Sequence, residues 1–413
     1  MEFSDEHKND GPAGSSAAKP AVCFLGPISS YTHQATLETF PADKFDLVPV
    51  TTIKDIFDTT QSGAATYGVV PFENSTNGSV VFTLDHFADR HGAYPDLSVC
   101  AEIYLDVHHC IVGHIPASSP SHSHTHSQPP PASSSDSPSP LPATGTEAPP
   151  QDQDEDADSP PISGQCTPTA SEPHPLAPRA RPLHPLTHVR RLYSHPQAFG
   201  QCTRFLGAYL RGVETVDVSS TSRAAQLVKE EGDEGKCDSA AISSAVAAEM
   251  LGLDVLARDV EDREDNTTRF FVLRRGAGRE GSVVGGLRRR GRRRDGVKDD
   301  GEEQTQQEGS SSPSDATSVL ARTKSLVSFT VPHRSPGALA DVLECFRRGG
   351  LNLTSISSRP SLAEPFQYIF FVEFEGHRFE DPEGRVDGVL RAVAEVARGW
   401  RWLGSWENMM MRR

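Results

Sequence analysis

Short apolar runs alternate with amphipathic segments along the first part of the chain. Apolar runs of this length predict strands, and apolar residues spaced on one helix face predict helices. This pattern predicts strands at 21–25, 45–50 and 67–71, a helix over the apolar set Val80, Val81, Leu84 and Phe87, and a long strand or strand pair at 97–112.

The same alternation returns after residue 188. It predicts strands at 189–193, 213–218 and 238–243 and helices at 198–210, 222–231 and 245–251. Strands that alternate with helices form mainly parallel sheets with helices on both faces. In such sheets, ligands bind beyond the carboxyl ends of the strands. We therefore predict an α/β fold for the blocks at 22–115 and 188–273.

The last block has a different rhythm. Its strands are predicted at 324–331, 351–358, 367–375 and 400–406. Between them, Leu339, Val342, Leu343 and Phe346 recur at i, i+3, i+4 and i+7, which is the spacing of an amphipathic helix, and residues 386–393 repeat it. The order βαββαβ is that of a ferredoxin-like domain.

Two segments interrupt this pattern. Residues 116–187 hold 18 of the 32 prolines, and residues 275–323 combine an arginine cluster at 288–294 with an acidic, Gln-rich stretch. Neither buries enough apolar surface to offset the entropy lost on ordering, so both are predicted to be disordered, as are residues 1–20. A solvated linker is favoured over a nucleic-acid patch at the arginine cluster, because no aromatic residues are interleaved to stack bases.

Composition narrows the function classes. The chain has 40 Lys and Arg against 56 Asp and Glu, a net charge of −16, which argues against a chain-wide nucleic-acid surface. No apolar run approaches the roughly 20 residues needed to cross a bilayer. The polar start resembles neither a signal nor a transit peptide, so we predict a cytoplasmic protein without a membrane partner. Seven cysteines without a C-x-x-C pair predict free thiols and no structural metal site.

Polar clusters stand at the ends of predicted strands. The first, at 26–35, is a hydroxyl-rich turn that opens a helix, where Ser30 could help to bind a carboxylate or could simply cap the helix. The second, at 71–79, carries Glu73-Asn74-Ser75, where a cap is again the alternative. The last, at 265–270, contains Arg269, which could grip a carboxylate with two hydrogen bonds or lie in an ordinary surface turn.

A further cluster, at 194–198, places Ser194 beside His195. This pair raises the possibility of a serine hydrolase. Neighbours in sequence do not place a hydroxyl on an imidazole, however, and no G-x-S-x-G elbow accompanies them. A hydrolase is therefore not favoured.

Together, the residues of these clusters and their order along the chain resemble the motifs of the prephenate dehydratase family. Residues 23–35 are similar to the opening of that family, 68–75 to its Glu-Asn-Ser signature and 266–270 to its Thr-Arg-Phe signature. The last block resembles its ACT regulatory domain through two motifs, Pro336-Gly337-Ala338-Leu339 and Ser358-Arg359-Pro360.

The resemblance implies a fold and a division of the chain. The catalytic domain would have two lobes with parallel-rich sheets, like a periplasmic binding protein, and a ferredoxin-like βαββαβ ACT domain would follow it. The implied segments are a disordered N-terminus at 1–20, lobe 1 at 21–115, a disordered Pro/Ser-rich insertion at 116–187, lobe 2 at 188–264, a strand returning to lobe 1 at 265–274, a disordered linker at 275–323 and the ACT domain at 324–406.

The resemblance also implies a reaction, in which prephenate loses carbon dioxide and its ring hydroxyl to give phenylpyruvate for phenylalanine synthesis. Formation of an aromatic ring drives this step, so no cofactor or metal is expected, but hydroxide leaves poorly and needs a proton donor. The implied catalytic residues are Thr268, the donor, with Arg269 and Phe270. The implied substrate-binding residues are Ser30, Tyr31, Thr32, Glu73, Asn74, Ser75, Ser194, His195 and Asn266. Arg269, the 30–32 turn and Asn74-Ser75 would orient the two substrate carboxylates.

Phenylalanine is the implied effector, bound by Pro336, Gly337, Ala338, Leu339, Ser358, Arg359 and Pro360. Two positions depart from the family pattern: Ser29 replaces a glycine, and Ser357 replaces a glutamate. Since ACT domains usually pair, we expect a homodimer or homotetramer. We also expect a monofunctional enzyme, because the chain before Ala21 is too short for a chorismate mutase domain. The alternatives are an arogenate dehydratase and a non-catalytic amino-acid sensor.

Overall fold

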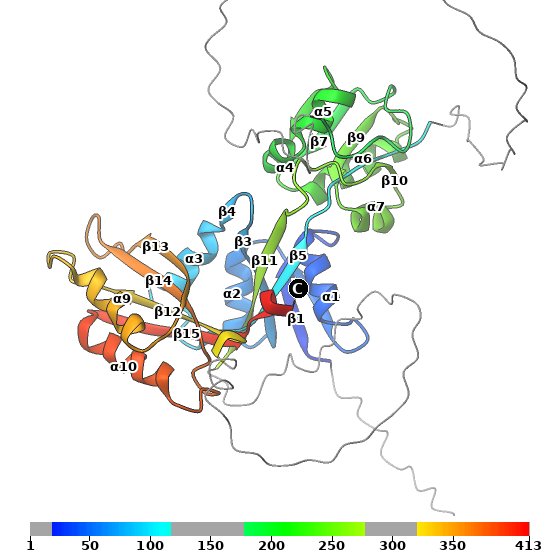
Figure 1. Ribbon diagram of the computed structural model, residues 1–413. Helices are drawn as coiled ribbons and strands as arrows, with labels where there is room; N and C mark the ends of the chain where they lie inside the picture. The colour runs from blue at the N-terminus through cyan, green and yellow to red at the C-terminus, as the bar shows by residue number, and fades with distance from the viewer. Residues whose placement is uncertain (1–18, 117–176, 277–319, 413) are drawn as a thin grey trace, which may run out of the picture.

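The computed structural model describes residues 19–116, 177–276 and 320–412, which form two α/β units and a C-terminal unit (Figure 1). Unit 1 contains β1 (Ala21–Leu25), α1 (Tyr31–Thr39), β2 (Asp46–Val50), α2 (Ile53–Gln61), β3 (Tyr67–Asn74), β4 (Gly78–Ser79), α3 (Val81–Ala88), β5 (Leu97–Asp106) and β11 (Thr267–Arg275). β1 is parallel to β2 and β3, whereas β11 runs antiparallel between β3 and β5.

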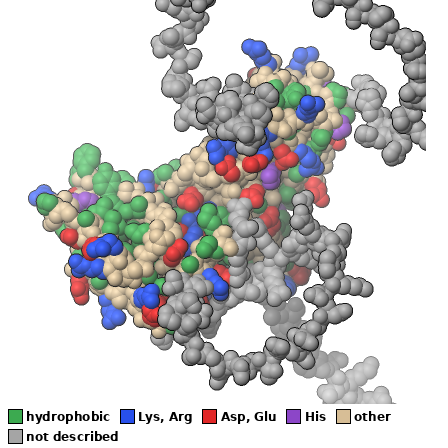
Figure 2. Space-filling model, in the orientation of Figure 1, with side chains coloured by type: hydrophobic (Ala, Val, Ile, Leu, Met, Phe, Trp, Pro, Cys, Tyr) green, Lys and Arg blue, Asp and Glu red, His purple; other side chains and the backbone are tan. Residues whose placement is uncertain are grey.

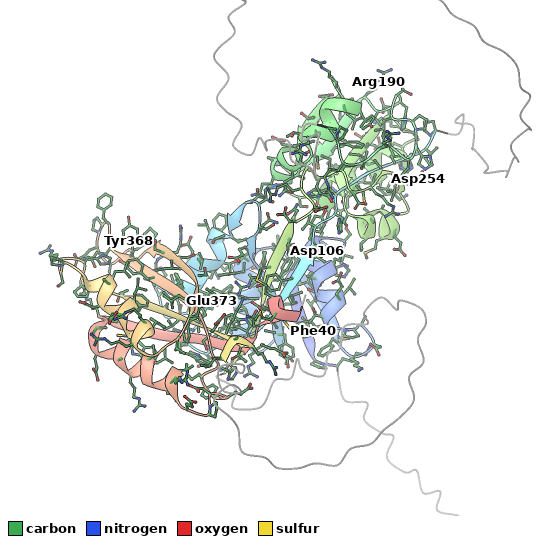
Figure 3. All side chains as sticks on the ribbon, viewed as in Figure 1. Phe40, Asp106, Arg190, Asp254, Tyr368 and Glu373 are labelled. Atoms are coloured by element: carbon green, nitrogen blue, oxygen red, sulfur yellow. The ribbon has the colours of Figure 1, made fainter. Side chains whose placement is uncertain are left out.

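Unit 2 is a five-stranded mixed sheet in the order β10-β6-β9-β7-β8. Its elements are β6 (Cys110–Gly113), β7 (Arg191–Ser194), α4 (Pro196–Gln201), α5 (Thr203–Tyr209), β8 (Glu214–Asp217), α6 (Thr221–Asp233), β9 (Ser239–Ser243), α7 (Ala245–Leu251) and β10 (Asp254–Ala257). The chain crosses between the units twice, from β5 to β6 and from β10 to β11 (Figure 1). Asp106 ends β5 at the first of these crossovers (Figure 3).

The C-terminal unit has the predicted βαββαβ order. It contains β12 (Thr323–Thr330), α9 (Ala338–Arg348), β13 (Leu353–Pro360), β14 (Tyr368–Glu375), α10 (Arg385–Val396) and β15 (Gly399–Glu407), followed by the 3₁₀ helix η2 (Met409–Arg412). Its antiparallel sheet, in the order β13-β14-β12-β15, continues into unit 1 because β15 meets β5 at Gly404 and Val99. A Cβ atom on Gly404 would lie 2.1 Å from the Val99 carbonyl oxygen, so this contact requires glycine.

A shared hydrophobic core joins unit 1 to the C-terminal unit. Phe271 of β11 packs against Trp406 of β15, with ring centroids 5.1 Å apart, and both side chains are buried. Leu326, Phe371 and Leu403 of the C-terminal unit belong to the same cluster. Unit 2 has separate cores on its own sheet. The C-terminal unit is therefore packed directly against the face of unit 1 that β11 helps to form.

Several predictions about the fold need correction. The sheets are mixed, because β11 and β6 run antiparallel to their neighbours. The strand predicted at 67–71 extends to Asn74, and the predicted pair at 97–112 splits between the two units. Residues 177–187 are ordered: Pro182 bridges to Ala257, and Leu186 is buried in unit 2. The rest of the predicted insertion, 1–18 and 277–319 lie outside the described residues. None of the helices in the described ranges is long and apolar enough to cross a membrane.

Candidate active site

Thr268 and Asn74 meet where β3 ends and β11 begins. The antiparallel register pairs the two residues, and the Nδ2 of Asn74 donates to Thr268 Oγ1 at 3.0 Å. The other side of this amide is fixed, because Asn74 Oδ1 accepts the backbone N–H groups of Thr76 and Asn77. Thr268 is therefore an acceptor toward Asn74, and its own hydroxyl proton is left to donate to another group.

Ser75 holds this junction together. Its hydroxyl donates to the carbonyl of Asp265 at 2.8 Å and accepts the N–H of Thr267 at 2.9 Å. Because these bonds tie the turn after β3 to the residues before Thr268, they place both signatures at one edge of the sheet. The helix-cap alternative for this cluster is wrong, since α3 begins only at Val81 and has no side-chain cap.

Asn266 extends the contact into unit 2. Its side chain is buried, its Oδ1 accepts from Asn74 Nδ2 at 2.8 Å, and its Nδ2 donates to Gln201 Oε1 at 3.2 Å. Gln201 ends α4 and was not singled out from the sequence. It lies in the helix predicted at 198–210, which in fact divides at Cys202. His109, another residue that sequence analysis missed, contacts both Gln201 and the predicted site residue Tyr31.

In the first polar cluster, at 26–35, Ser30 caps a helix, as one of the two alternatives predicted. Ser30 is the N-cap of α1: its hydroxyl accepts the N–H of His33 at 3.1 Å and donates to the carbonyl of Leu25 at 2.9 Å. Thr32 is buried in the first turn of the same helix. The capping bonds hold the N-terminal amides of Tyr31 and Thr32 at the carboxyl end of β1, where N–H groups favour an anion.

Ser194 and His195 do not form a catalytic pair. Ser194 Oγ donates to the carbonyl of Ile242 at 3.0 Å, which ties β7 to β9. His195 caps α4 by accepting the N–H of Gln197 at its Nδ1. These contacts give no support to a serine hydrolase. Ser194 is fully buried, so its predicted contact with substrate is not supported either.

Arg269 lies on the opposite face of β11 from Thr268, as strand alternation requires. It is 3% exposed, and its Nη2 donates to Glu102 at 2.6 Å and to Glu373 at 2.5 Å. Glu73 lies 3.5 Å from Nη1. Burial lowers the pKa of Arg269, but Glu373 and Glu102 outweigh it, so the pKa is raised. The predicted grip of Arg269 on a substrate carboxylate needs correction, because two buried carboxylates already hold the guanidinium.

Phe270 also needs correction as a catalytic residue. Its side chain is 1% exposed and belongs to a core cluster with Phe24, Phe40 and Val272. It therefore supports the face of β11 that carries Thr268, and its burial gives no support to a direct role in catalysis.

A model of the prephenate dehydratase family matches residues 22–134 and 179–277, about half of the chain. The chain belongs to the prephenate dehydratase family. A bifunctional chorismate mutase/prephenate dehydratase from Aquifex aeolicus is 28% identical over 394 residues, which cover 95% of this chain and 75% of that protein.

Solved structures show that the fold is shared. The prephenate dehydratase from Arthrobacter aurescens in complex with L-Phe has a TM-score of 0.61 at 22% identity, and the match covers 94% of this chain and 90% of that one. GqqA, described as a novel type of quorum quenching acylase, has a TM-score of 0.58 at 21% identity, with 95% and 100% covered. Likeness at this identity establishes the fold and leaves the activity to the site.

In this member of the prephenate dehydratase family, the two predicted effector segments lie at one end of the C-terminal sheet. Arg359 of β13 and Thr330 of β12 both pair with Ile369 of β14, the strand between them, so β13 and β12 end at the same end of the sheet. Gly337 is the N-cap of α9 and lies in the left-handed region at φ 83°. Ser358 is exposed, and Arg359 is held by Asp85 of α3, with bonds of 2.8 and 2.9 Å.

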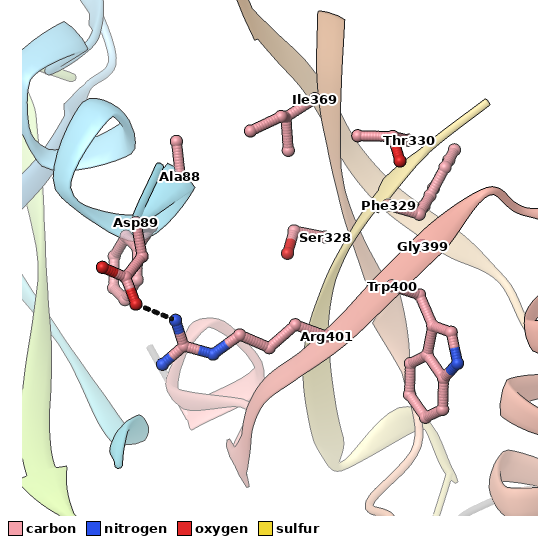
Figure 4. Close-up of a pocket in the computed structure, with 10 residues that line it drawn as sticks. Ala88, Asp89, Ser328, Phe329, Thr330, Ile369, Gly399, Trp400 and Arg401 are labelled. Carbon is pink, nitrogen blue, oxygen red and sulfur yellow. Dashed lines mark hydrogen bonds and ion pairs between the residues drawn. The ribbon is translucent and has the colours of Figure 1, made fainter. Parts of the chain in front are cut away.

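A cavity of about 190 Å³ lies between α3 and the C-terminal sheet (Figure 4). Its wall includes Ser328, Ile369 and the ion pair of Arg401 with Asp89, at 3.1 Å. None of its lining residues belongs to the polar clusters around Thr268, so it is separate from the candidate active site.

One described group could offer ligands to a metal ion. His108, Asp259 and Glu261 place one ligating atom each within 4.8 Å of one another. The Nη1 of Arg179 lies 3.6 Å from the same Glu261 oxygen that faces His108, and this positive charge disfavours a cation there.

Proposed function

We propose that this chain is a prephenate dehydratase, a carbon–oxygen lyase that converts prephenate to phenylpyruvate, carbon dioxide and water in phenylalanine biosynthesis. The C–C bond to the ring carboxylate breaks as the C–O bond to the ring hydroxyl breaks, and the electron pair completes the aromatic ring. One proton is taken up, because the departing hydroxide leaves as water. Aromatisation supplies the driving force, and the barrier lies in the poor leaving group.

One observation carries this proposal: in the hydrogen bond between Asn74 and Thr268, Asn74 is the donor. Because the Asn74 amide donates to Thr268 Oγ1, the hydroxyl proton of Thr268 is available to the departing oxygen. A threonine hydroxyl is a weak acid, so it acts here as a fixed hydrogen-bond donor that stabilises charge as it develops. The proton consumed in the reaction then comes ultimately from solvent.

We place the substrate between the two α/β units, which would be the lobes of a domain resembling a periplasmic binding protein. Both chain crossovers and the contact between Asn266 and Gln201 lie at this junction. Since Arg269 is held elsewhere, the first-turn amides of α1, at Tyr31 and Thr32, are the better candidates for a substrate carboxylate. Asn74 and Thr268 would face the ring hydroxyl.

The C-terminal unit would be an ACT domain that binds phenylalanine. Its βαββαβ order and the shared sheet end of the two effector segments support this assignment. A second copy could pair along β13, the outer strand of the sheet, where large apolar side chains are exposed. They gather at the end of the C-terminal unit (Figure 2) and comprise Ile356, Leu362, Phe366 and Tyr368. We therefore propose a homodimer or a homotetramer.

The test is direct. Purified protein is incubated with prephenate and, separately, with arogenate, and phenylpyruvate and phenylalanine are followed. Turnover of prephenate supports the proposal, whereas turnover of arogenate alone would make the chain an arogenate dehydratase. Binding of phenylalanine without any turnover would favour the amino-acid sensor. Adding phenylalanine to the active enzyme tests regulation, and an unchanged rate would refute it.

A further inference from the structure

A chain of hydrogen bonds runs from Tyr31 of unit 1 to Thr268, by way of unit 2. The hydroxyl of Tyr31 lies 2.8 Å from His109 Nδ1, and His109 Nε2 lies 2.8 Å from Gln201 Oε1. Gln201 Oε1 also accepts from Asn266, which in turn contacts Asn74. Directly bonded partners in this chain lie up to 194 positions apart in the sequence, so only the folded protein assembles them.

The direction of every bond in this chain follows from the backbone. The N–H groups of Thr76 and Asn77 fix the oxygen of Asn74, so its nitrogen donates to Asn266 Oδ1. Asn266 must then donate to Gln201 Oε1. Because that oxygen is an acceptor, His109 must carry its proton on Nε2, and its Nδ1 must accept the hydroxyl proton of Tyr31.

His109 lies on the first crossover between the units, and Asn266 ends the second. Gln201 accepts hydrogen bonds from both side chains, and its carbonyl also accepts the N–H of Asp262 on the second crossover. Rotation of two lobes takes place at such crossovers. The side chain of His109 therefore ties the hinge to the residues that orient Thr268.

The surroundings favour a neutral imidazole at His109. The ring is 2% exposed, and burial lowers its pKa below the ordinary value, against the opposing effects of the Gln201 hydrogen bond and of Glu261. Glu261 accepts the backbone N–H of His109 and does not bond to its ring. The other titratable or charged groups around this region are Tyr31, His108, Cys110, Arg179, Cys202, Arg258, Asp259 and Asp262. Burial raises the pKa of Tyr31 and of both cysteines, so these groups stay protonated.

We propose that His109 is a positioning residue for the dehydration: it holds Gln201 Oε1 toward Asn266, so that Asn266 keeps its own oxygen on Asn74 and the junction of Asn74 with Thr268 stays in place. The inference rests on the proposed function. Without the Nε2 donor, the Gln201 amide is free to turn its nitrogen toward Asn266. That turn would set two donors against each other, and Asn266 could relieve the conflict only by giving up its bond to Asn74, whose amide is held by the backbone of Thr76 and Asn77.

The experiment compares two substitutions at this position. His109→Leu removes both ring nitrogens, and His109→Gln keeps an N–H donor near the position of Nε2. We expect His109→Leu to lower kcat by roughly ten- to a hundred-fold, the range set by one lost buried hydrogen-bond partner, with KM changed less than about two-fold. His109→Gln should recover most of the rate. His86→Leu, the same change at a half-buried histidine of α3, serves as the control and should keep the wild-type kcat.

A wild-type kcat in His109→Leu would overturn the proposal, as would equal losses of kcat in His109→Leu and His109→Gln. If wild-type protein fails to turn over prephenate, the proposed function itself falls, and that result precedes any variant.

Discussion

Thr268 and Arg269 are neighbours on β11, yet they face opposite environments. Thr268 ends a chain of neutral side chains in which each hydrogen bond has a defined donor: Asn74 donates to both Asn266 and Thr268, and Asn266 donates to Gln201. Arg269 enters a buried ionic cluster with Glu102, Glu373 and Lys324. Glu373 lies at the boundary between the C-terminal unit and unit 1 (Figure 3). One face of β11 thus carries the candidate catalytic residue Thr268, and the other face carries Arg269, which links unit 1 to the C-terminal unit.

The difference teaches what each kind of polar network is suited to do. In the neutral network, each bond has a fixed direction, so it can orient a proton. In the ionic cluster, Arg269 and Lys324 balance Glu102 and Glu373, and strong charge-assisted bonds repay the desolvation of the buried groups only while all the partners are present. A change on the first face should therefore alter rate, and a change on the second should alter stability.

The largest expected effect is on the neutral face. Thr268→Ala removes the hydroxyl donor and should lower kcat by roughly 10²–10³-fold, as for other single donors to a developing charge. The melting temperature should change little, because Thr268 is only half-buried. Thr268→Ser keeps the hydroxyl and should retain much of the rate. Turnover of purified Thr268→Ala near the wild-type value would refute the assignment.

The next effect lies on the ionic face. Arg269→Met leaves Glu102 and Glu373 buried with Lys324 as their remaining cation, and should cost about 3–5 kcal/mol of stability, measured by urea unfolding. Arg275→Met, at an exposed position of the same strand, should cost no more than about 1 kcal/mol. A large fall in kcat with unchanged stability would instead indicate that Arg269 binds the substrate.

A third prediction concerns the second link between unit 1 and the C-terminal unit. Asp85 of α3 pairs with Arg359, and the Nε of Arg90 donates to the carbonyl of Pro360. Asp85→Asn should leave kcat without phenylalanine unchanged and weaken inhibition by roughly five-fold or more, the lower range of allosteric coupling. The concentration for half-maximal inhibition measures this effect. If it stays the same, this ion pair does not carry the coupling.

The smallest effect is expected in the turn before α1, beside the neutral face. Ser29 has φ 80°, in the left-handed region that glycine adopts without strain, and its buried hydroxyl has no hydrogen-bond partner among the described residues. Ser29→Gly should therefore stabilise the protein by about 1 kcal/mol, seen as a rise of roughly 2–4 °C in melting temperature. Ser62→Gly, at φ −69°, is the matched control and should bring no gain.

Much of the fold could be predicted from local patterns. The βαββαβ order and most strands and helices of units 1 and 2 follow the apolar spacing, and the cap at Ser30 follows from its place before a helix. The strand that ends in Asn74 was cut short, because polar residues at a strand end look like a turn. The segment at 177–187 was predicted to be disordered from its prolines, although Pro182 bonds along an exposed strand edge, a position that proline tolerates.

The candidate site divides in the same way. The order of the signatures indicated that Asn74, Ser75 and Thr268 act together, and the antiparallel pairing of β3 with β11 explains why. The sequence analysis assigned both Thr268 and Arg269 to the substrate, whereas alternation along β11 places them on opposite faces. No local pattern, however, indicated that the C-terminal unit covers the Arg269 face. Nor did one indicate His109 and Gln201, which are 92 positions apart and meet only where the units join.

The amino-acid sequence alone determined the elements, their caps and the polar turns, because these depend on neighbours within a few positions. The tertiary structure decided which buried charges balance one another and which side-chain amides form hydrogen bonds with each other. Those contacts join distant segments, so their geometry exists only once the sheets have paired and the crossovers have brought the units together.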